Sequence, residues 1–423
     1  MAVEIQAPYD ALVREDSVHR RLYTDPEIFR DEMARIFGRT WVFVAHESEV
    51  PEPGDFKTDT LAGRPIIISR DADGQVHLLY NACRHRGAMV CVLPKGNASF
   101  FRCPYHAWTY KPDGKLALVP SQYALGPDFD LSDHPLVPVA RVESYQGFIF
   151  ASLAPEGPSL REHLGRATHY IDLFVERAPN GVVRATKPLK YEYPGNWKLQ
   201  MDNMADNYHA EFTHASAFTI RPDALVPRTN GFTSNGSYED QTDRNYPTGK
   251  TFGPGIGCAF YHGGRQIVSD PDRYPDYLAA LAKAHGEERA RELAGLHFHL
   301  MIYPNLILHP LYSHYRVIRP ISVDHTEINV YPCALEGAPD ALNEALIKAA
   351  ALHVSAGGQV QVDDLEAFAR VQEGLKTEAF DWLLFKMGGE ETDNEYGERE
   401  TKVLSEMIPR GFYREWRRLM AQP

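Results

Sequence analysis

The chain has 423 residues, a hydrophobic fraction of 43% and a formal net charge of −13 at neutral pH. This length exceeds one ordinary hydrophobic core and predicts two domains, while the acidic balance argues against nucleic-acid binding, for which a basic face is expected. No run of about eighteen apolar residues occurs, which excludes a membrane-spanning helix.

The N-terminal part begins with one helix and then changes to short strands. Its first residues lack the basic-then-apolar order of a secretory signal, so we expect a cytoplasmic protein. In "DPEIFRDEMARIFG", Asp25 can cap a helix, Pro26 suits the first helical position and Gly38 ends it. The segments "RPIIIS", "VHLLY", "FFRCPYHAW" and "GFIFAS" then alternate with turns. They predict a small all-β domain at 40–153, preceded by a helical lead-in at 1–39.

The remainder, 154–423, mixes longer helices with strands after the boundary-like "LAPEGPS". We expect "NWKLQMDNMADNYHAEFTH" to be largely helical and "DYLAALAKAHGEERARELAG" to be one charged surface helix. The segments "HFHLMIYPNLILHP", "HYRVIRP" and "TEINVYPCAL" predict neighbouring strands of an antiparallel sheet. An alanine-rich helix follows from about residue 339, and the chain closes with a helix in "GFYREWRRLMAQ". The predicted fold class is therefore α+β.

Two short loops in the β domain combine cysteine with histidine. "ACRHRGAMV" supplies Cys83 and His85, and "CPYH" supplies Cys103 and His106, with seventeen residues between the halves. Because each loop offers one thiolate and one imidazole, the set suits a two-iron cluster in which the cysteines hold one iron and the histidines the other. Zinc is the alternative, although common zinc fingers group cysteine with cysteine and histidine with histidine. The other cysteines fit small core residues, in place of a disulfide framework: Cys91, Cys258 and Cys333.

A second set of metal-binding residue types lies in "DNMADNYHAEFTH". On a helix Asp206 and His209 share a face, whereas His214 points away unless the helix bends or ends between the histidines. Two histidines and one carboxylate form the facial triad of non-haem Fe(II) oxygenases. The remaining ligand must come from elsewhere, and we expect it where Asp363 and Asp364 begin a helix in "GGQVQVDDLEAFARVQEGL".

Both motifs, in this order, resemble the large (alpha) subunits of Rieske non-haem iron aromatic-ring-hydroxylating oxygenases, and the resemblance covers essentially the whole chain. It implies that Cys83, His85, Cys103 and His106 hold a Rieske [2Fe–2S] cluster, that His209 and His214 bind mononuclear Fe(II), and that Asp206 links the two centres. The family pattern favours Asp364 as the carboxylate ligand, because it precedes Gln372 by eight residues. Asp363 stays open as the alternative.

The resemblance also implies the reaction and the partners. The chain would be a terminal oxygenase that uses O₂ to hydroxylate an aromatic substrate, by cis-dihydroxylation. Electrons would come from NAD(P)H through a partner reductase, with or without a ferredoxin, since this chain has no dinucleotide fingerprint. A Rieske monooxygenase or demethylase is the alternative, and a simple electron carrier would leave the second metal set unexplained.

Relatives have a helix-grip catalytic domain and assemble as trimers, so we expect a homotrimer, with or without a small beta subunit. His106 of one chain would then lie near Asp206 and His209 of the next. Asn203 and Tyr208 are candidates to support the iron ligands. We expect the lead-in at 1–39 to pack on the catalytic domain, and the substrate pocket to be lined by parts of 218–225, 258–265 and 300–309.

Overall fold

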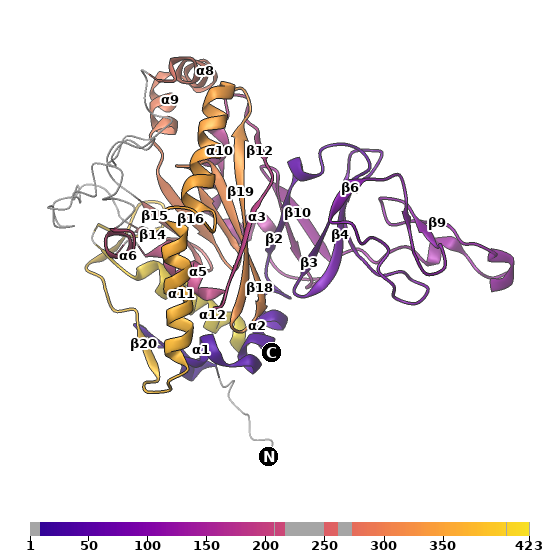
Figure 1. Ribbon diagram of the computed structural model, residues 1–423, viewed down its shortest axis with the longest axis horizontal. Helices are drawn as coiled ribbons and strands as arrows, with labels where there is room; N and C mark the ends of the chain where they lie inside the picture. Colours follow the sequence, from indigo (N-terminus) through magenta and orange to yellow (C-terminus); the bar gives the residue numbers. More distant parts are fainter. Residues whose placement is uncertain (1–8, 207, 216–248, 261–272, 403, 423) are drawn as a thin grey trace. The chain divides into compact units, whose positions relative to one another are not determined.

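The computed structural model describes residues 9–422 except 207, 216–248, 261–272 and 403 (Figure 1). The chain forms two compact units. Met33–Leu160 is one, and the described residues up to Glu32 join those from Arg161 onward in the other. The predicted pocket segment at 218–225, and residues 261–265 of the predicted segment 258–265, lie outside the described residues. Within the described part, no helix is long and apolar enough to span a membrane.

The unit Met33–Leu160 is built from strands, as predicted. It holds a three-stranded sheet in the order β10-β11-β2, a four-stranded sheet β5-β4-β3-β6, and a three-stranded sheet β7-β8-β9. The strands are β2 (Val42–His46), β3 (Asp55–Leu61), β4 (Arg64–Arg70), β5 (Val76–Tyr80), β6 (Lys95–Asn97), β7 (Phe101–Arg102), β8 (Thr109–Tyr110), β9 (Leu116–Leu118), β10 (Arg141–Tyr145) and β11 (Phe148–Ser152).

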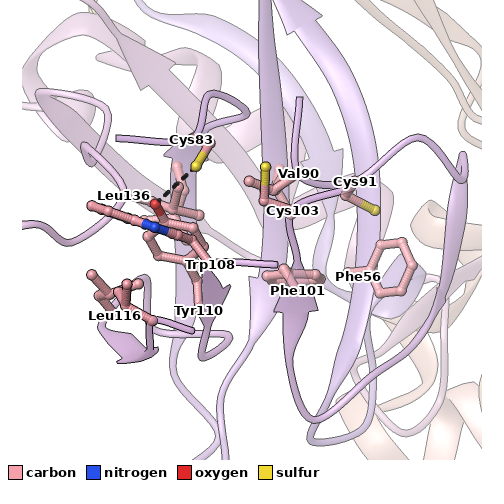
Figure 2. Packing of buried hydrophobic residues seen from close by; sticks show 13 residues of the cluster. Phe56, Cys83, Val90, Cys91, Phe101, Cys103, Trp108, Tyr110, Leu116 and Leu136 are labelled. Atoms are coloured by element: carbon pink, nitrogen blue, oxygen red, sulfur yellow. Dashed lines mark hydrogen bonds between the residues drawn. The ribbon is translucent and has the colours of Figure 1, made fainter. Parts of the chain in front are cut away.

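A hydrophobic cluster fills this unit between the second and third sheets. Phe56, Phe101 and Trp108 belong to this cluster together with Cys83 and Cys103, which are 3% and 2% exposed (Figure 2). Because both cysteines are buried in this cluster, they fix the two loops that follow β5 and β7 at the edge of the core, while the loops themselves are largely exposed.

The other unit contains a ten-stranded sheet. Its main path runs β12-β19-β18-β17-β16-β15-β14-β22-β21, with β13 also paired to β19. The predicted strands of the C-terminal half are confirmed as neighbours in its centre. Its members are β12 (Val183–Ala185), β13 (Leu189–Tyr193), β14 (Gly249–Thr251), β15 (Ile256–Phe260), β16 (Phe298–Ile302), β17 (Leu306–His309), β18 (His314–Ser322), β19 (His325–Leu335), β21 (Glu391–Asp393) and β22 (Arg399–Thr401).

Helices cover both faces of this sheet. On one face, α4 (Ala167–Glu176) contacts β16 and β17, where Tyr170 meets Phe298 at a ring-centroid distance of 5.8 Å. Alternate residues of a strand point to opposite faces, so His299 belongs to the other face. There α5 (Lys198–Ala205) contacts β15 and β16, and α11 (Gln361–Leu375) runs alongside (Figure 1).

The remaining predicted helices are present with small differences in extent. Asp25 caps the first of them, accepting a hydrogen bond from the backbone N–H of Glu27 at 2.8 Å. These helices are α2 (Pro26–Arg35), α8 (Pro275–His285), α9 (Glu287–Ala294), α10 (Asp340–Val354) and α12 (Met407–Ala421). The expected single surface helix around residue 286 is in fact α8 and α9. Gly286 separates them because its φ of +87° lies outside helical geometry.

The helical prediction across the histidine segment was wrong at Asp206. The chain leaves α5 there with φ −104° and ψ 106°, and re-enters a short helix, α6 (His209–Thr213). Asp206 Oδ1 accepts hydrogen bonds from the backbone N–H groups of Tyr208 and His209 at 2.6 and 3.4 Å. A short acidic side chain that captures backbone donors in this way starts a new helix in preference to continuing the old one.

Buried polar side chains anchor the start of α5. The carboxylate of Glu32 is fully buried and accepts hydrogen bonds from Trp197 Nε1, Lys198 Nζ and Trp416 Nε1 at 2.7–2.8 Å. One turn later, Asp202 accepts hydrogen bonds at 2.8 Å from both Tyr23 and Tyr413. These contacts fasten the N-terminal segment and α12 to the helix that leads into the histidine segment.

Asp202 makes stability depend on pH. Burial raises the pKa of its carboxyl from 3.8 to about 7, although hydrogen bonds from Tyr23 and Tyr413 act in the opposite direction. A raised folded-state pKa means that the folded chain binds the proton more tightly. The contribution of Asp202 is therefore full below pH 4 and is lost as the pH rises towards 7. We expect Asp202→Asn, which retains an acceptor and cannot ionise, to melt at a higher temperature than the parent at pH 8.

Thermal unfolding followed by circular dichroism at pH 5 and pH 8 tests this expectation. The advantage of the variant should grow by on the order of 2–4 kcal/mol, since one pKa unit corresponds to about 1.4 kcal/mol. An advantage that is the same at both pH values would show that Asp202 does not ionise in this range.

Candidate metal centres

The two Cys/His loops have the same backbone design. In the first, the Cys83 N–H donates to Ala88 O and the Gly87 N–H donates to Cys83 O, both at 2.8 Å. In the second, the Cys103 N–H donates to Trp108 O at 2.8 Å and the Ala107 N–H donates to Cys103 O at 3.0 Å. In each loop the fourth residue after the cysteine has a left-handed backbone conformation, with φ of +73° at Gly87 and +58° at Ala107.

These loops bring their four candidate ligands to one edge of the unit. The rings of His85 and His106 lie 4.5 Å apart, and Trp108 stacks on His85 at 5.0 Å. The Cys83 and Cys103 sulfurs lie at the same end of the hydrophobic cluster, while the sulfur of Cys91 points away from them (Figure 2). Nδ1 of His85 is buried without a hydrogen-bond partner, which is the state of a nitrogen that serves as a metal ligand.

A two-iron cluster and a single zinc ion need different arrangements of these ligands. Among the described residues, the groups whose donor atoms all lie within 4.8 Å of one another do not include the two Cys/His loops. A tetrahedral zinc ion needs all its ligands around one centre at about 2.0–2.3 Å. One sulfur and one imidazole from each loop are the donor set that suits two metal ions, one held by the sulfurs and one by the imidazoles.

Tyr110 lies against the first sulfur. Its hydroxyl is 3.3 Å from Cys83 Sγ and accepts the backbone N–H of Arg84 at 3.0 Å. Burial and the contact with Cys83 raise the pKa of this hydroxyl, so it remains protonated and donates to a thiolate. The sequence motif did not single out Tyr110, because its contact with Cys83 spans a loop and two strands.

Removal of the Tyr110 hydroxyl should lower the reduction potential of the cluster. A hydrogen bond to sulfur stabilises the reduced form, which carries more negative charge. A hydrogen bond to a charged group contributes about 1.5–3 kcal/mol of stability. A free-energy difference of about 1.4 kcal/mol corresponds to a difference of about 59 mV in the reduction potential of a one-electron couple. We expect Tyr110→Phe to lower the potential by on the order of 50 mV in a redox titration. An unchanged potential would exclude the hydrogen bond.

The second candidate centre joins α6 to α11. Nε2 of His209 and Nε2 of His214 lie 3.6 and 3.3 Å from Asp364 Oδ1, and the ligand atoms of all three residues lie within 4.8 Å of one another. The helix ends at Thr213, between the two histidines, as the ligand spacing required. Two imidazoles and one carboxylate are the donor set of a mononuclear Fe(II) site.

The two adjacent aspartates have different positions. The Asp364 side chain is 5% exposed and approaches both Nε2 atoms, whereas Asp363 is 27% exposed and lies 3.3 Å from Nδ1 of His214. A carboxylate on the far nitrogen fixes the tautomer and orientation of a ligating imidazole. The geometry therefore favours Asp364 as the ligand and gives Asp363 an orienting role that the sequence did not reveal.

Asp206 and Asn203 lie against opposite nitrogens of the His209 ring. Asn203 Nδ2 lies 3.0 Å from Asp364 Oδ1 and 3.1 Å from His209 Nε2, bridging two members of the group. Asp206 Oδ2 lies 3.5 Å from His209 Nδ1, on the opposite side of the ring. Burial lowers the pKa of His209, but Asp206 and Asp364 outweigh it and the net shift is upwards. Tyr208 is exposed, with its ring beside Phe212.

Comparison with known proteins agrees with both centres. The Rieske [2Fe–2S] domain family matches residues 40–142, and the family "Ring hydroxylating alpha subunit (catalytic domain)" matches residues 182–422. The chain belongs to the ring-hydroxylating oxygenase alpha subunits. A toluate 1,2-dioxygenase alpha subunit from Pseudomonas putida is 36% identical over 86% of this chain and 82% of its own length. The anthranilate 1,2-dioxygenase large subunit of Acinetobacter baylyi is 32% identical over 89% and 80%.

Solved structures agree with the fold of this alpha subunit. A naphthalene 1,2-dioxygenase variant bound to phenanthrene superposes with a TM-score of 0.84 at 28% identity, covering 97% of this chain and 94% of that one. The α+β fold class and the two-part organisation are thereby confirmed. As a member of this family, the chain is an oxidoreductase that carries a Rieske cluster and non-haem iron, and it works with O₂ and an electron-donating partner.

Proposed function

We propose that this oxygenase cis-dihydroxylates an aromatic carboxylic acid. The observation that carries the proposal is the shared chemistry of three relatives, named for toluate, anthranilate and 2-halobenzoate, which are 32–36% identical over 86–89% of the chain. The substrates in all three names carry a carboxylate on a benzene ring, and each enzyme is named as a 1,2-dioxygenase.

A buried cation supports an anionic substrate. Arg316 on β18 is 4% exposed, and its side chain donates to Gln361 Oε1 at 2.9 Å and to His314 Nε2 at 3.3 Å. Both partners are neutral groups, and no carboxylate of the described residues forms an ion pair with Arg316 within 4.0 Å. A buried guanidinium with neutral partners favours a carboxylate nearby.

Substrate comparison tests the assignment. We expect the purified enzyme, supplied with a reductase and NADH, to convert benzoate or a substituted benzoate to a cis-diol that contains both atoms of ¹⁸O₂. Arg316→Gln should raise KM for the acid at least about tenfold and leave KM for toluene unchanged. Arg319→Gln is the matched control, because Arg319 lies on the same strand but forms an ion pair with Glu327. Equal effects on both substrates would contradict carboxylate recognition.

We assign the site residues as follows. Cys83, His85, Cys103 and His106 hold the Rieske cluster, and His209, His214 and Asp364 hold Fe(II). The iron supplies O₂ activation when bound, and the chain orients its own ligands: Asp363 holds His214 through Nδ1, and Asn203 spans Asp364 and His209. The limits 1–39, 40–153 and 154–423 remain our proposed lead-in, Rieske domain and catalytic domain.

For the assembly we propose a trimer of this chain, with or without a small beta subunit, that receives electrons from a reductase or ferredoxin. His106 of one subunit would then pass electrons towards Asp206 and His209 of its neighbour. Demethylation is the second candidate activity. It is favoured by one relative, an N,N-dimethyl phenylurea N-demethylase alpha subunit from Sphingobium, which is 30% identical over 93% of this chain. Product analysis with an N-methylated phenylurea distinguishes the two reactions, because demethylation removes a methyl group from nitrogen whereas dihydroxylation gives a cis-diol on the ring.

A further inference from the structure

Two buried side chains, Arg316 and Tyr191, lie on the same face of the ten-stranded sheet, on either side of β19. Arg316 on β18 pairs with Val330 on β19, which in turn pairs with Leu189 on β13. Directly paired residues point to the same face, as do residues two apart on one strand, so Tyr191 shares the face of Arg316. Only β19 separates the two strands, a distance of about 10 Å that two long side chains can bridge.

Helix α11 covers this face and brings the iron ligand to the level of Tyr191. Gln361, the first residue of α11, reaches β18, and the ring of Phe368 lies 4.9 Å from that of Tyr193 on β13. Gln361, Asp364 and Phe368 belong to one buried stripe of this helix. Asp364 therefore lies between the two contacts, beside Tyr191, which precedes Tyr193 by two residues.

The hydroxyl of Tyr191 is a buried donor without an acceptor. Tyr191 is 6% exposed, and its hydroxyl oxygen has no hydrogen-bond partner in the part of the chain that the structure describes. Burial raises the pKa of this hydroxyl, Arg316 lowers it and Asp364 raises it, so both charged groups are near the oxygen. The hydroxyl stays protonated at neutral pH, and burial of such a donor costs free energy unless an acceptor is supplied.

Arg316 retains a donor nitrogen for the same acceptor. Its Nε donates to His314 Nε2 at 3.3 Å and its Nη1 to Gln361 Oε1 at 2.9 Å. Neither bond uses Nη2, for which no described residue provides an acceptor. Because Gln361 accepts through Oε1, its Nε2 is also left without a partner among the described residues. Donors on three neighbouring side chains thus await an acceptor with several lone pairs.

We propose that Tyr191 and Arg316 together bind the carboxylate of the substrate, the hydroxyl donating to one oxygen and the guanidinium to the other. This assignment rests on the proposed function, oxidation of an aromatic carboxylic acid. Because Tyr191 lies beside Asp364, the pair holds the carboxyl end of the ring nearest the iron site, as attack at carbons 1 and 2 requires. The groups around it are donors, so a carboxylate is favoured over a carboxamide, whose NH₂ would face another donor.

Equilibrium binding of benzoate and of benzamide to the iron-loaded, full-length protein tests the proposal. Isothermal titration calorimetry without a reductant measures both affinities in the absence of turnover. We expect the parent protein to bind benzoate at least about tenfold more tightly than benzamide. Tyr191→Phe removes a single oxygen atom and should weaken benzoate binding by about 10–100-fold, with a much smaller effect on benzamide.

Tyr193→Phe is the matched control. Tyr193 lies on the same strand and face, but its hydroxyl already donates to the carbonyl oxygen of Asn196 at 3.1 Å, so this variant should keep the preference for benzoate. Gln361→Glu offers Arg316 a carboxylate from the chain itself and should abolish the preference. Combining Tyr191→Phe with Arg316→Gln should weaken benzoate binding by less than the product of the single effects, because both donors bind one group.

The possible failures have different signatures. Benzoate binding in Tyr191→Phe as tight as in the parent, equal losses for benzoate and benzamide, or a preference retained in Gln361→Glu would overturn the role of this pair while leaving the proposed function intact. A parent protein that neither prefers benzoate nor converts it to a cis-diol would overturn the proposed function, and the carboxylate site with it.

Discussion

Replacement of Asp364 by alanine should remove the iron from the mononuclear site and lower turnover by more than about 1,000-fold. Asp364 Oδ1 lies 3.3 and 3.6 Å from the Nε2 atoms of His214 and His209, and its side chain is almost fully buried. Without this carboxylate, two neutral imidazoles remain, and they balance neither the charge nor the geometry of Fe(II). Iron analysis should show about two irons per chain, those of the cluster, with an unchanged Rieske EPR signal.

Asp363→Asn is the matched control for this prediction. The side chain at 363 contacts Nδ1 of His214, the nitrogen that faces away from the group, at 3.3 Å. We expect this variant to keep its third iron, with affinity lowered by about 10–100-fold, as is usual when a partner of a metal ligand is changed. The reverse pattern, with iron lost from Asp363→Asn and retained in Asp364→Ala, would make Asp363 the ligand.

Replacement of Asp206 by asparagine should leave both metal centres in place and nearly abolish electron transfer between them. Asp206 Oδ2 faces Nδ1 of His209 at 3.5 Å, opposite the nitrogen that faces Asp364. Asparagine keeps the Oδ1 acceptor that receives the backbone N–H of Tyr208, so the start of α6 should survive. The negative charge beside the histidine is lost.

Single-turnover kinetics measures this effect. With the cluster reduced chemically and substrate and O₂ added, we expect cluster reoxidation to slow by at least about 100-fold relative to the parent protein. Asp363→Asn makes the same acid-to-amide change beside the other histidine and should slow it far less. Normal reoxidation in Asp206→Asn would remove the bridging role from this residue.

Subunit complementation extends the same test to the assembly. A His106→Ala chain lacks a working cluster, and a His209→Ala chain lacks a working iron site. If electrons pass between subunits of a trimer, co-expression of the two inactive chains should restore part of the activity. If both centres act within one chain, the mixture should stay inactive.

The local sequence was sufficient for features that depend on neighbouring residues. The paired C-x-H and C-x2-H loops, the capped helix after Asp25 and the alternating strands of the C-terminal half could all be predicted, because turn geometry, capping and side-chain periodicity act over a few residues. The interruption between α8 and α9 at Gly286 was not predicted, although a glycine within a helical pattern can indicate where a helix ends.

Tertiary structure decided the features that depend on distant segments. The choice between Asp363 and Asp364 required the position of α11 against α6, because adjacent helical residues point about 100° apart and only one can face both histidines. The contact of Tyr110 with Cys83 depends on how the sheet β7-β8-β9 packs against the loop that follows β5. Packing between two sheets is a long-range interaction that no single segment specifies.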